Sequence, residues 1–208
     1  GCSVRGIETS GGRLSKVITE KGAISTSTAL CAAGAWSSYF CRSLGISVPQ
    51  LKVRGTVART NTVETKINGT IFDRQLSIRK RNDGGYTVAH GSTFDHAITP
   101  SSLKYSKKYL RALINEFSVL KLSIGTDFID ELAAPKHWDL DKKSPFEMNR
   151  VLNPKPNKKT ISQIQKKLGE VYPELRNANI VESWAGMVET TPDVIPVISH
   201  IDKIPGFY

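Results

Sequence analysis

The sequence predicts an α+β fold in which a largely antiparallel sheet carries flanking helices, and three features of the chain indicate it. Hydrophobic and polar residues alternate along stretches joined by tight-turn residues, a pattern typical of antiparallel strands. Later stretches repeat hydrophobic residues at three- and four-residue spacing, as amphipathic helices do. Hydrophobic residues make up 39% and charged residues 23% of the 208 residues, so the chain can bury a sizeable core.

The first 30 residues predict β structure. Short hydrophobic runs are separated by turn residues at 10–12 and 20–22. The third run, residues 29–33, does not alternate and stops at Gly34. Such a run predicts a strand buried on both faces of a sheet, with Cys31 as a small core residue.

Residues 51–88 predict an antiparallel meander of four or five strands. Leu51 begins the first alternating run, and residues 63–67 lead into the Asn-Gly pair at 68–69, the strongest short hairpin signal. A second hairpin is predicted at the Asn-Asp-Gly-Gly turn of 82–85, returning through residues 86–88.

Two amphipathic helices follow, with a shorter helical piece at 128–132. Thr99 before Pro100 predicts the start of the first, and Thr160 opens a capping box that predicts the start of the second. The Pro- and Lys-rich residues 135–156 should cross the surface between them. We expect two buried stripes: Leu103, Leu110, Leu113, Ile114, Phe117 and Leu120 in the first helix, and Ile161, Ile164, Leu168 and Val171 in the second. Strand-like runs return at 188, 194–195 and 197–198, limited by prolines.

The net charge of +10 invites a nucleic-acid interpretation, but the basic residues are scattered and lack interleaved aromatic residues. A solvated, lysine-rich surface is therefore favoured, and no nucleic-acid partner is expected. The cysteines and histidines show no metal-ligand spacing, so no metal site is expected. The absence of an export signal and the lone cysteines favour a cytoplasmic location. No local arrangement of catalytic residues and no glycine-rich phosphate loop is visible, so the catalytic residues stay unknown.

Several motifs, in order, resemble those of a known family. Residues 31–37 (CAAGAWS) and 184–196 (WAGMVETTPDVIP) resemble two signatures of the D-amino-acid oxidase superfamily, in the branch of glycine oxidase and bacterial D-amino-acid dehydrogenase. Residues 44–45 with 53–55 resemble the entry into that family's substrate domain, and residues 79–86 resemble one of its strand pairs. The likeness covers nearly the whole chain.

The resemblance implies an FAD cofactor and several site residues. The stretch of Ala33, Gly34, Ala35 and Trp36 would pass close to the FAD, because small residues let a flat cofactor approach the backbone. The alternative is a strand-to-helix turn in which small residues serve packing alone.

The residues expected to bind the substrate depart from the family pattern. Val188 stands where the family usually has an arginine that grips the substrate carboxylate, so either Arg54, Arg79 or Arg81 supplies the charge or the substrate is a different amine. Tyr86 could line the pocket, although a half-buried strand tyrosine is the commoner explanation.

We therefore expect a fragment of an FAD-dependent oxidoreductase that oxidises the C–N bond of a D-amino acid, glycine or a related secondary amine by hydride transfer. Residues 1–48 would be a remnant of a doubly wound FAD-binding domain, residues 49–182 a substrate domain, and residues 183–208 the return to the FAD-binding domain. Because the family's glycine-rich flavin contacts are absent from the sequence, we expect this chain alone to retain no FAD and to be inactive, and its exposed strands to favour self-association. The alternative is a non-catalytic binding module completed by a partner chain. The electron acceptor, oxygen or quinone, stays open.

Overall fold

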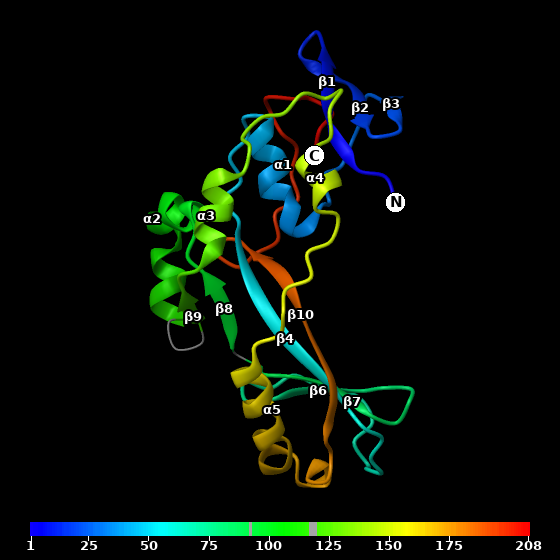
Figure 1. Cartoon of the computed structure of the whole chain (residues 1–208), viewed down its shortest axis with the longest axis vertical. Coiled ribbons are helices and arrows are strands. Elements are labelled where there is room, and N and C mark those ends of the chain that lie inside the picture. The colour runs from blue at the N-terminus through cyan, green and yellow to red at the C-terminus, as the bar shows by residue number, and fades with distance from the viewer. Residues whose placement is uncertain (92, 117–119) are drawn as a thin grey trace.

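The structure is a computed structural model that describes residues 1–91, 93–116 and 120–208. It is elongated, with a small sheet near both chain ends and a larger sheet below it (Figure 1). Two long antiparallel strands run from the junction of the two parts to the far end of the molecule. Antiparallel sheets with flanking helices confirm the predicted α+β class.

The small sheet contains the strands β1 (Val4–Ser10), β2 (Arg13–Thr19) and β3 (Gly22–Ser25), paired antiparallel in that order. Gly11 and Gly12 form the first turn with φ of 57° and 78°, a region that L-residues rarely adopt. The β structure predicted for this part of the chain is confirmed.

The strand predicted at 29–33 is wrong in its burial. Ala29 forms a parallel bridge to Phe207, the backbone of Cys31 donates to Tyr208, and Leu30 is 70% exposed. A strand buried on both faces needs neighbours on each side, and residues 206–208 are the only ones that pair with this run in the described chain. Cys31 does pack against a hydrophobic cluster that contains Phe40 and Phe207.

A short 3₁₀ turn, η1 (Gly34–Trp36), and the helix α1 (Ser37–Ser43) connect this part to the large sheet. The central strands are β4 (Leu51–Thr60) and β10 (Ile180–Thr190), which pair antiparallel along almost their full lengths. The other strands flank β4, in the order β5-β6-β7-β4-β8-β9. They are β5 (Thr70–Ile71), β6 (Ser77–Lys80), β7 (Tyr86–Ala89), β8 (Phe94–Ala97) and β9 (Leu120–Ser123), of which β8 and β9 are parallel to each other.

One of the two predicted hairpins is confirmed and the other is wrong. β6 and β7 pair across the turn at 82–85, where Gly84 has a φ of 82°. Residues 63–67 form no strand, and β5 pairs with β6 instead. The reason is a distant side chain: the hydroxyl of Tyr86 donates to the carbonyl of Ile67 at 2.7 Å, which holds this segment over the core.

The main core lies between the sheet and the helix α5 (Lys158–Val171), which is followed by the 3₁₀ turn η2 (Pro173–Leu175). The predicted stripe is confirmed, since Ile164 and Leu168 are fully buried. The predicted start at Thr160 is wrong, because the side chain of Asn157 accepts from the backbone of Lys159 at 3.0 Å and caps the helix three residues earlier. Asn157 is fixed in turn by donating to Asp95 at 2.8 Å.

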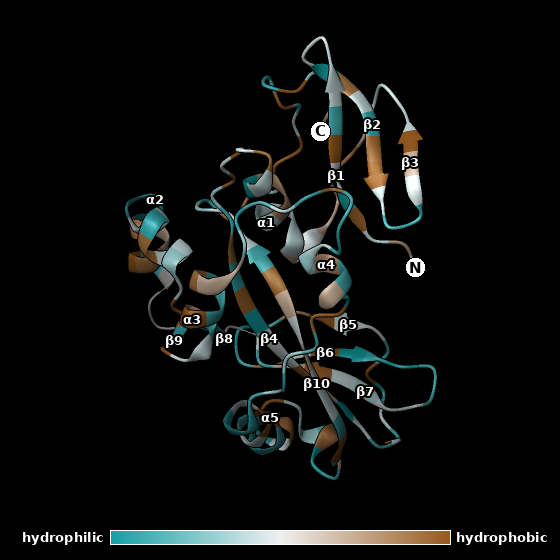
Figure 2. Ribbon diagram, turned by 45° about the horizontal axis from the view of Figure 1, so that its top comes forward, coloured by the Kyte–Doolittle hydropathy of each residue, from teal (hydrophilic) through white to brown (hydrophobic). Residues whose placement is uncertain are grey.

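The helices α2 (Pro100–Glu116) and α3 (Thr126–Ala133) confirm the predicted helical segments, but the predicted buried face of α2 is wrong. Leu103, Leu110 and Ile114 are all more than half exposed, Leu120 belongs to β9, and Phe117 lies outside the described residues. Hydrophobic and hydrophilic residues alternate along α2 in Figure 2.

Two tyrosines form the inward face of α2 instead. The hydroxyl of Tyr109 donates to the carbonyl of Pro49 at 2.9 Å and accepts from the backbone of Leu51 at 3.2 Å. The hydroxyl of Tyr105 lies 2.9 Å from that of Ser47. These polar contacts orient the helix, and a leucine at either position could not form them. No helix in the described ranges is long and apolar enough to cross a membrane.

The connection predicted to cross the surface, residues 135–156, packs firmly on the N-terminal part and includes the helix α4 (Pro145–Met148). We call it the strap. The indole of Trp138 donates to the carbonyl of Arg5 at 2.7 Å, and Arg5 pairs with Glu147 at 2.8 Å. Arg150 forms an ion pair with Glu20 of the small sheet. The strap is therefore an anchored element rather than a loose crossing.

The strand-like runs predicted at 194–198 are not strands. Their hydrophobic side chains are more than half exposed, and residues 195–200 have no regular structure. Pro192 and Pro196 lack the backbone N–H groups that a ladder requires, and Val194 has a φ of 61°, which is incompatible with a strand.

Because both helices show the same spacing of hydrophobic residues, their different burial can be tested directly. Leu168→Ala in α5 should lower the free energy of unfolding by about 2–5 kcal/mol, since Leu168 is 1% exposed. Leu110→Ala in α2 should change it by less than about 0.5 kcal/mol, since Leu110 is 56% exposed. Urea titrations of both variants measure the difference, and equal losses would contradict the observed packing.

Candidate functional site

The pair β4–β10 presents two different faces, because directly paired residues of antiparallel strands point the same way. On one face, Ala58 packs beneath α5 and Arg54 touches the strap. On the other, the side chains are half-exposed or exposed. We call this second surface the glycine face; on β4 and β10 it is formed by Val53, Gly55, Trp184, Gly186 and Val188.

Gly55 and Gly186 lie directly opposite each other at the middle of the glycine face. A Cβ at Gly186 would meet nothing within 4 Å, and one at Gly55 would make only ordinary contacts with Phe94 and Val188, at 3.8 and 4.0 Å. Packing within the described chain therefore does not require either glycine. A glycine inside a strand costs roughly 0.5–1 kcal/mol, and it often marks a place where a ligand comes close to the backbone.

Apolar side chains surround this flat patch. Trp184 and Phe94 are each about one-third exposed, and Val188 is 48% exposed. Together with the opposed glycines they leave a low, apolar floor on which a planar ring system could lie. The residues present thus fit a flavin ring at this face.

The segment predicted to contact FAD meets the end of β10. Gly34 has a φ of 54°, which favours glycine, and a Cβ there would lie 3.5 Å from the carboxylate of Glu189. Ala33 is exposed and Ala35 half-buried. Trp36 turns away toward the strap and stacks on Phe146, with ring centroids 6.4 Å apart. The structure thus brings Gly34 next to the strand end that carries Val188.

The other two predicted substrate residues lie away from Val188. Arg54 occupies the opposite face, where its Nη2 lies 3.1 Å from Asp95 and its Nη1 donates to the carbonyl of Lys155. Tyr86 is fully buried in the main core, near the end of β4 that lies farther from Gly55. Its hydroxyl donates a hydrogen bond to the carbonyl of Ile67.

Two further arginines had been left open as carriers of the charge. Arg81 pairs with Asp83 at 3.1 Å. Arg79 is exposed and pairs in register with Thr87, which pairs with Arg59 of β4. Arg79 therefore lies on the same face of the sheet as Arg59. Gly55 lies on that face too, since positions along a strand alternate between faces.

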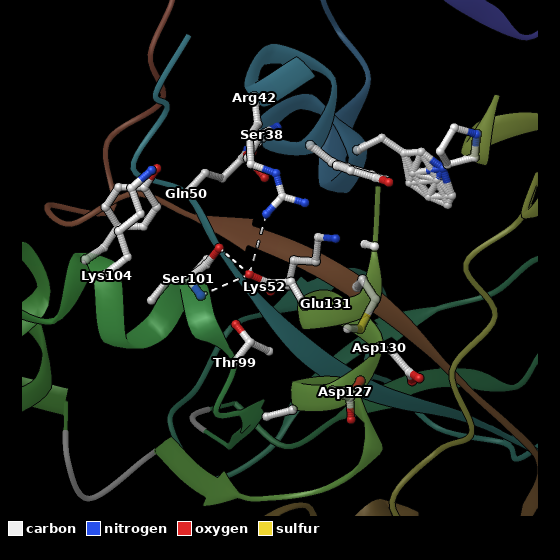
Figure 3. Close-up of a pocket in the computed structure, with 18 of the residues that line it drawn as sticks. Ser38, Arg42, Gln50, Lys52, Thr99, Ser101, Lys104, Asp127, Asp130 and Glu131 are labelled. Atoms are coloured by element: carbon white, nitrogen blue, oxygen red, sulfur yellow. Dashed lines mark hydrogen bonds and ion pairs between the residues drawn. The ribbon is translucent and has the colours of Figure 1, made fainter. Parts of the chain in front are cut away.

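A cavity of about 470 Å³ opens on the opposite side of the same strand pair, at the end near α1. Arg42, Lys52 and Glu131 lie in its middle, contributed by α1, β4 and α3 (Figure 3). Glu131 accepts hydrogen bonds from the backbone and hydroxyl of Ser101. Burial lowers the pKa of Lys52, because it removes water from the ammonium group.

The sequence motifs contained some of these residues without revealing their arrangement. Gly55 and Gly186 belonged to two motifs, but nothing in the sequence showed that they are partners. Lys52 and Arg42 carried no signal at all, since the cavity brings together segments that are distant in the chain. In the described part of the chain, no group of histidine, cysteine and acidic residues could hold a metal ion.

Comparison with known proteins now decides the family. A family model described as "FAD dependent oxidoreductase" (DAO) matches residues 1–208. The chain belongs to the DAO family. Among solved structures, an L-amino acid deaminase from Proteus myxofaciens is 34% identical, with a TM-score of 0.92 over 99% of this chain and 46% of that one.

Glycine oxidases are more distant relatives. The enzyme from Pseudomonas putida is 22% identical over 99% of this chain. The structure of the glycine oxidase from Bacillus cereus matches at 16% identity with a TM-score of 0.62, over all of this chain and 43% of that one. The chain spans 40% of the length of the Pseudomonas putida enzyme. It is thus a partial representative of the family, related in sequence to glycine oxidase.

The attachment of the strap, which supplies Phe146 to the cavity wall, should depend on pH. Hydrogen bonds from Arg150 hold the pKa of Glu20 at about 2, and those from Arg5 hold the pKa of Glu147 at about 2, against an ordinary value of 4.5. A lowered pKa means that the stabilisation is complete above pH 4.5 and is lost as the pH falls toward about 2. The NMR signal of the Trp138 indole N–H, which reports the strap contact, should shift over that range.

A variant without the carboxylate provides the comparison. Glu147→Gln should give the shifted Trp138 signal already at neutral pH, whereas Glu8→Gln, which removes an exposed pair with Lys16, should leave it unchanged. A Trp138 signal that stays constant down to pH about 2 would show that these ion pairs do not hold the strap.

Proposed function

We propose that this chain forms the substrate-facing part of an FAD-dependent oxidoreductase that oxidises the C–N bond of an α-amino acid. The observation that carries the proposal is the glycine face, where Gly55 and Gly186 oppose each other although packing requires neither. The chain belongs to the DAO family of FAD-dependent oxidoreductases over its whole length, so FAD is the cofactor that we expect at this face.

The residues of the chain would position the reactants. A flavin bound there would supply the acceptor for a hydride from the substrate carbon that carries the amine. Gly55 and Gly186 would let a flat ring approach the backbone, and Trp184 and Phe94 would exclude water around it. Gly34 would bring the second flavin-side segment to the end of β10, beside the carboxylate of Glu189. Orientation and water exclusion are what such a site must provide, because the cofactor performs the transfer.

Recognition of the carboxylate needs a donor other than Val188, whose side chain is apolar. Arg54 and Arg81 are already paired with Asp95 and Asp83. Arg79 is exposed on the same side of the sheet as Gly55, which supports it as the remaining candidate among these three.

The L-enantiomer is the substrate that the comparisons favour. The solved L-amino acid deaminases from Proteus myxofaciens and Proteus vulgaris are 34% and 29% identical to this chain, against 22% for the glycine oxidase from Pseudomonas putida. This difference supports an amino-acid deaminase in place of the D-amino acid or glycine oxidation that the motifs alone suggest.

Blocking the glycine face should weaken flavin binding. Lumiflavin, the ring system without its nucleotide, should perturb the backbone amide signals of Gly55 and Gly186 when it is titrated into the chain. Gly186→Val fills the floor and should weaken this binding at least about tenfold, which corresponds to roughly 1.4 kcal/mol. Chemical-shift mapping measures both effects.

Ala23→Val is the matched control, since it adds bulk to an exposed strand position on the small sheet. It should leave lumiflavin binding unchanged. Perturbations centred on residues beneath α5, or equal affinity for Gly186→Val and the parent chain, would refute the assignment of the glycine face.

Enantiomer choice tests the substrate. Flavin-loaded protein that contains this chain is mixed with the L- or the D-forms of the same amino acids in the absence of oxygen. Its visible flavin absorption should disappear at least about tenfold faster with the L-forms. A tenfold ratio of rates corresponds to a difference of about 1.4 kcal/mol in the barrier. Glycine serves as the achiral comparison. A preference for D-forms or for glycine would overturn the deaminase assignment while leaving the family membership intact.

A further inference from the structure

The cavity beside α1 has the volume of a ligand site. Its volume of about 470 Å³ falls within the roughly 300–1,000 Å³ typical of small-molecule pockets. Its wall combines β4 and β10, through Lys52 and Met187, with α1 and the strap. Lys52 and Met187 both point to the side of the strand pair opposite Gly55 and Gly186, as their register shows.

Lys52 brings a positive charge into this cavity without a counter-ion. Within the described ranges, its ammonium group forms neither an ion pair nor a hydrogen bond, although the residue is half-buried. Burial lowers its pKa, and the neighbouring Arg42 acts in the same direction, while Glu131 and Asp127 oppose them from a distance. A partly desolvated cation with no acceptor is unfavourable, and an anion bound beside it would remove that cost.

Glu131 does not fill this role. One carboxylate oxygen, Oε1, accepts from the backbone and hydroxyl of Ser101, and the same oxygen lies 3.9 Å from Nη1 of Arg42. The guanidinium of Arg42 is held above the ring of Tyr39 at 4.9 Å. The Nε of Arg42 is buried without an acceptor, so a ligand would bind the terminal N–H groups of the guanidinium. Arg42 and Lys52 therefore form a cationic pair in a cavity that is also lined by Lys104 and by the carboxylates of Asp127, Asp130 and Glu131 (Figure 3). Among the described residues, none of these carboxylates forms an ion pair with Lys52.

The wall next to these cations is aromatic. Trp36 stacks on Phe146 at 6.4 Å, and Tyr39 meets Phe146 edge-on at 5.5 Å. Leu152 and Met187 extend the apolar lining. His96 does not add a free group, because its Nδ1 lies 2.7 Å from the carbonyl of Lys52 and its Nε2 lies 2.9 Å from Ser102 Oγ.

We propose that this cavity binds a small organic carboxylate with an apolar body, whose carboxylate lies between Lys52 and Arg42 and whose body packs against Trp36 and Phe146. The proposal rests on the cavity alone and holds whether or not the glycine face receives a flavin. Charge-assisted hydrogen bonds from Lys52 supply most of the selectivity for an acid over its neutral analogue.

Phenylacetate and phenylacetamide test the proposal, because they share a shape and differ in charge. Isothermal titration of the chain should show phenylacetate binding at least tenfold more tightly than the amide. Lys52→Met should weaken phenylacetate at least tenfold and leave the amide unchanged, while Lys52→Arg should retain most of the affinity. Chemical-shift mapping should place the bound acid at the indole of Trp36.

Two controls separate the possible outcomes. Lys108→Met removes an exposed lysine of α2, and Gly186→Val alters the opposite face; neither should change phenylacetate affinity. The urea midpoint of Lys52→Met should not fall, which shows that the variant is folded. Equal affinity for acid and amide, an unchanged Lys52→Met, or no binding of phenylacetate would each overturn the proposal. Because Gly186→Val is measured in both experiments, failure here is distinguishable from failure of the flavin assignment.

Discussion

The antiparallel pairing of β4 with β10 is the constraint on which the rest of the structure depends. Its register runs from Thr190 opposite Leu51 to Ile180 opposite Thr60. It decides which residues share a face, so that Gly55 meets Gly186 and Lys52 points to the same side as Met187. A slip of one residue would move every side chain to the other face, and would destroy the glycine face and the cavity together. One ladder of backbone hydrogen bonds therefore positions both candidate sites.

The sequence predicted correctly those elements that are determined by their own residues. The turn at 82–85 forms because Gly84 can adopt a positive φ, and the stripe of α5 is buried because a hydrophobic sheet lies opposite it. The Asn-Gly pair at 68–69 failed because the hydroxyl of Tyr86, distant in sequence, takes the carbonyl of Ile67. Periodicity showed which residues of α2 share a face, but the partners of Tyr109 decided which face turns inward.

The candidate site could be predicted only in part for a similar reason. The resemblance to the family gave Gly34 and Val188, and the structure brings their segments together at the end of β10. It also suggested Arg54 and Tyr86, but Arg54 is engaged by Asp95 on the other face and Tyr86 lies in the core. The cavity had no signal, because a half-buried lysine without a counter-ion can be recognised only after the segments around it are placed.

The strap has a consequence for how the molecule can be divided. It begins after α3, reaches the small sheet through Trp138 and Arg150, and leads directly to Asn157, which caps α5. The chain ends also interleave, since residues 206–208 pair beside Ala29. The two parts are thus discontinuous in sequence, and no single cut separates them into independent folding units. Cleavage within the strap would leave two pieces that remain associated, whereas removal of residues 1–48 would take away the surface on which the strap is anchored.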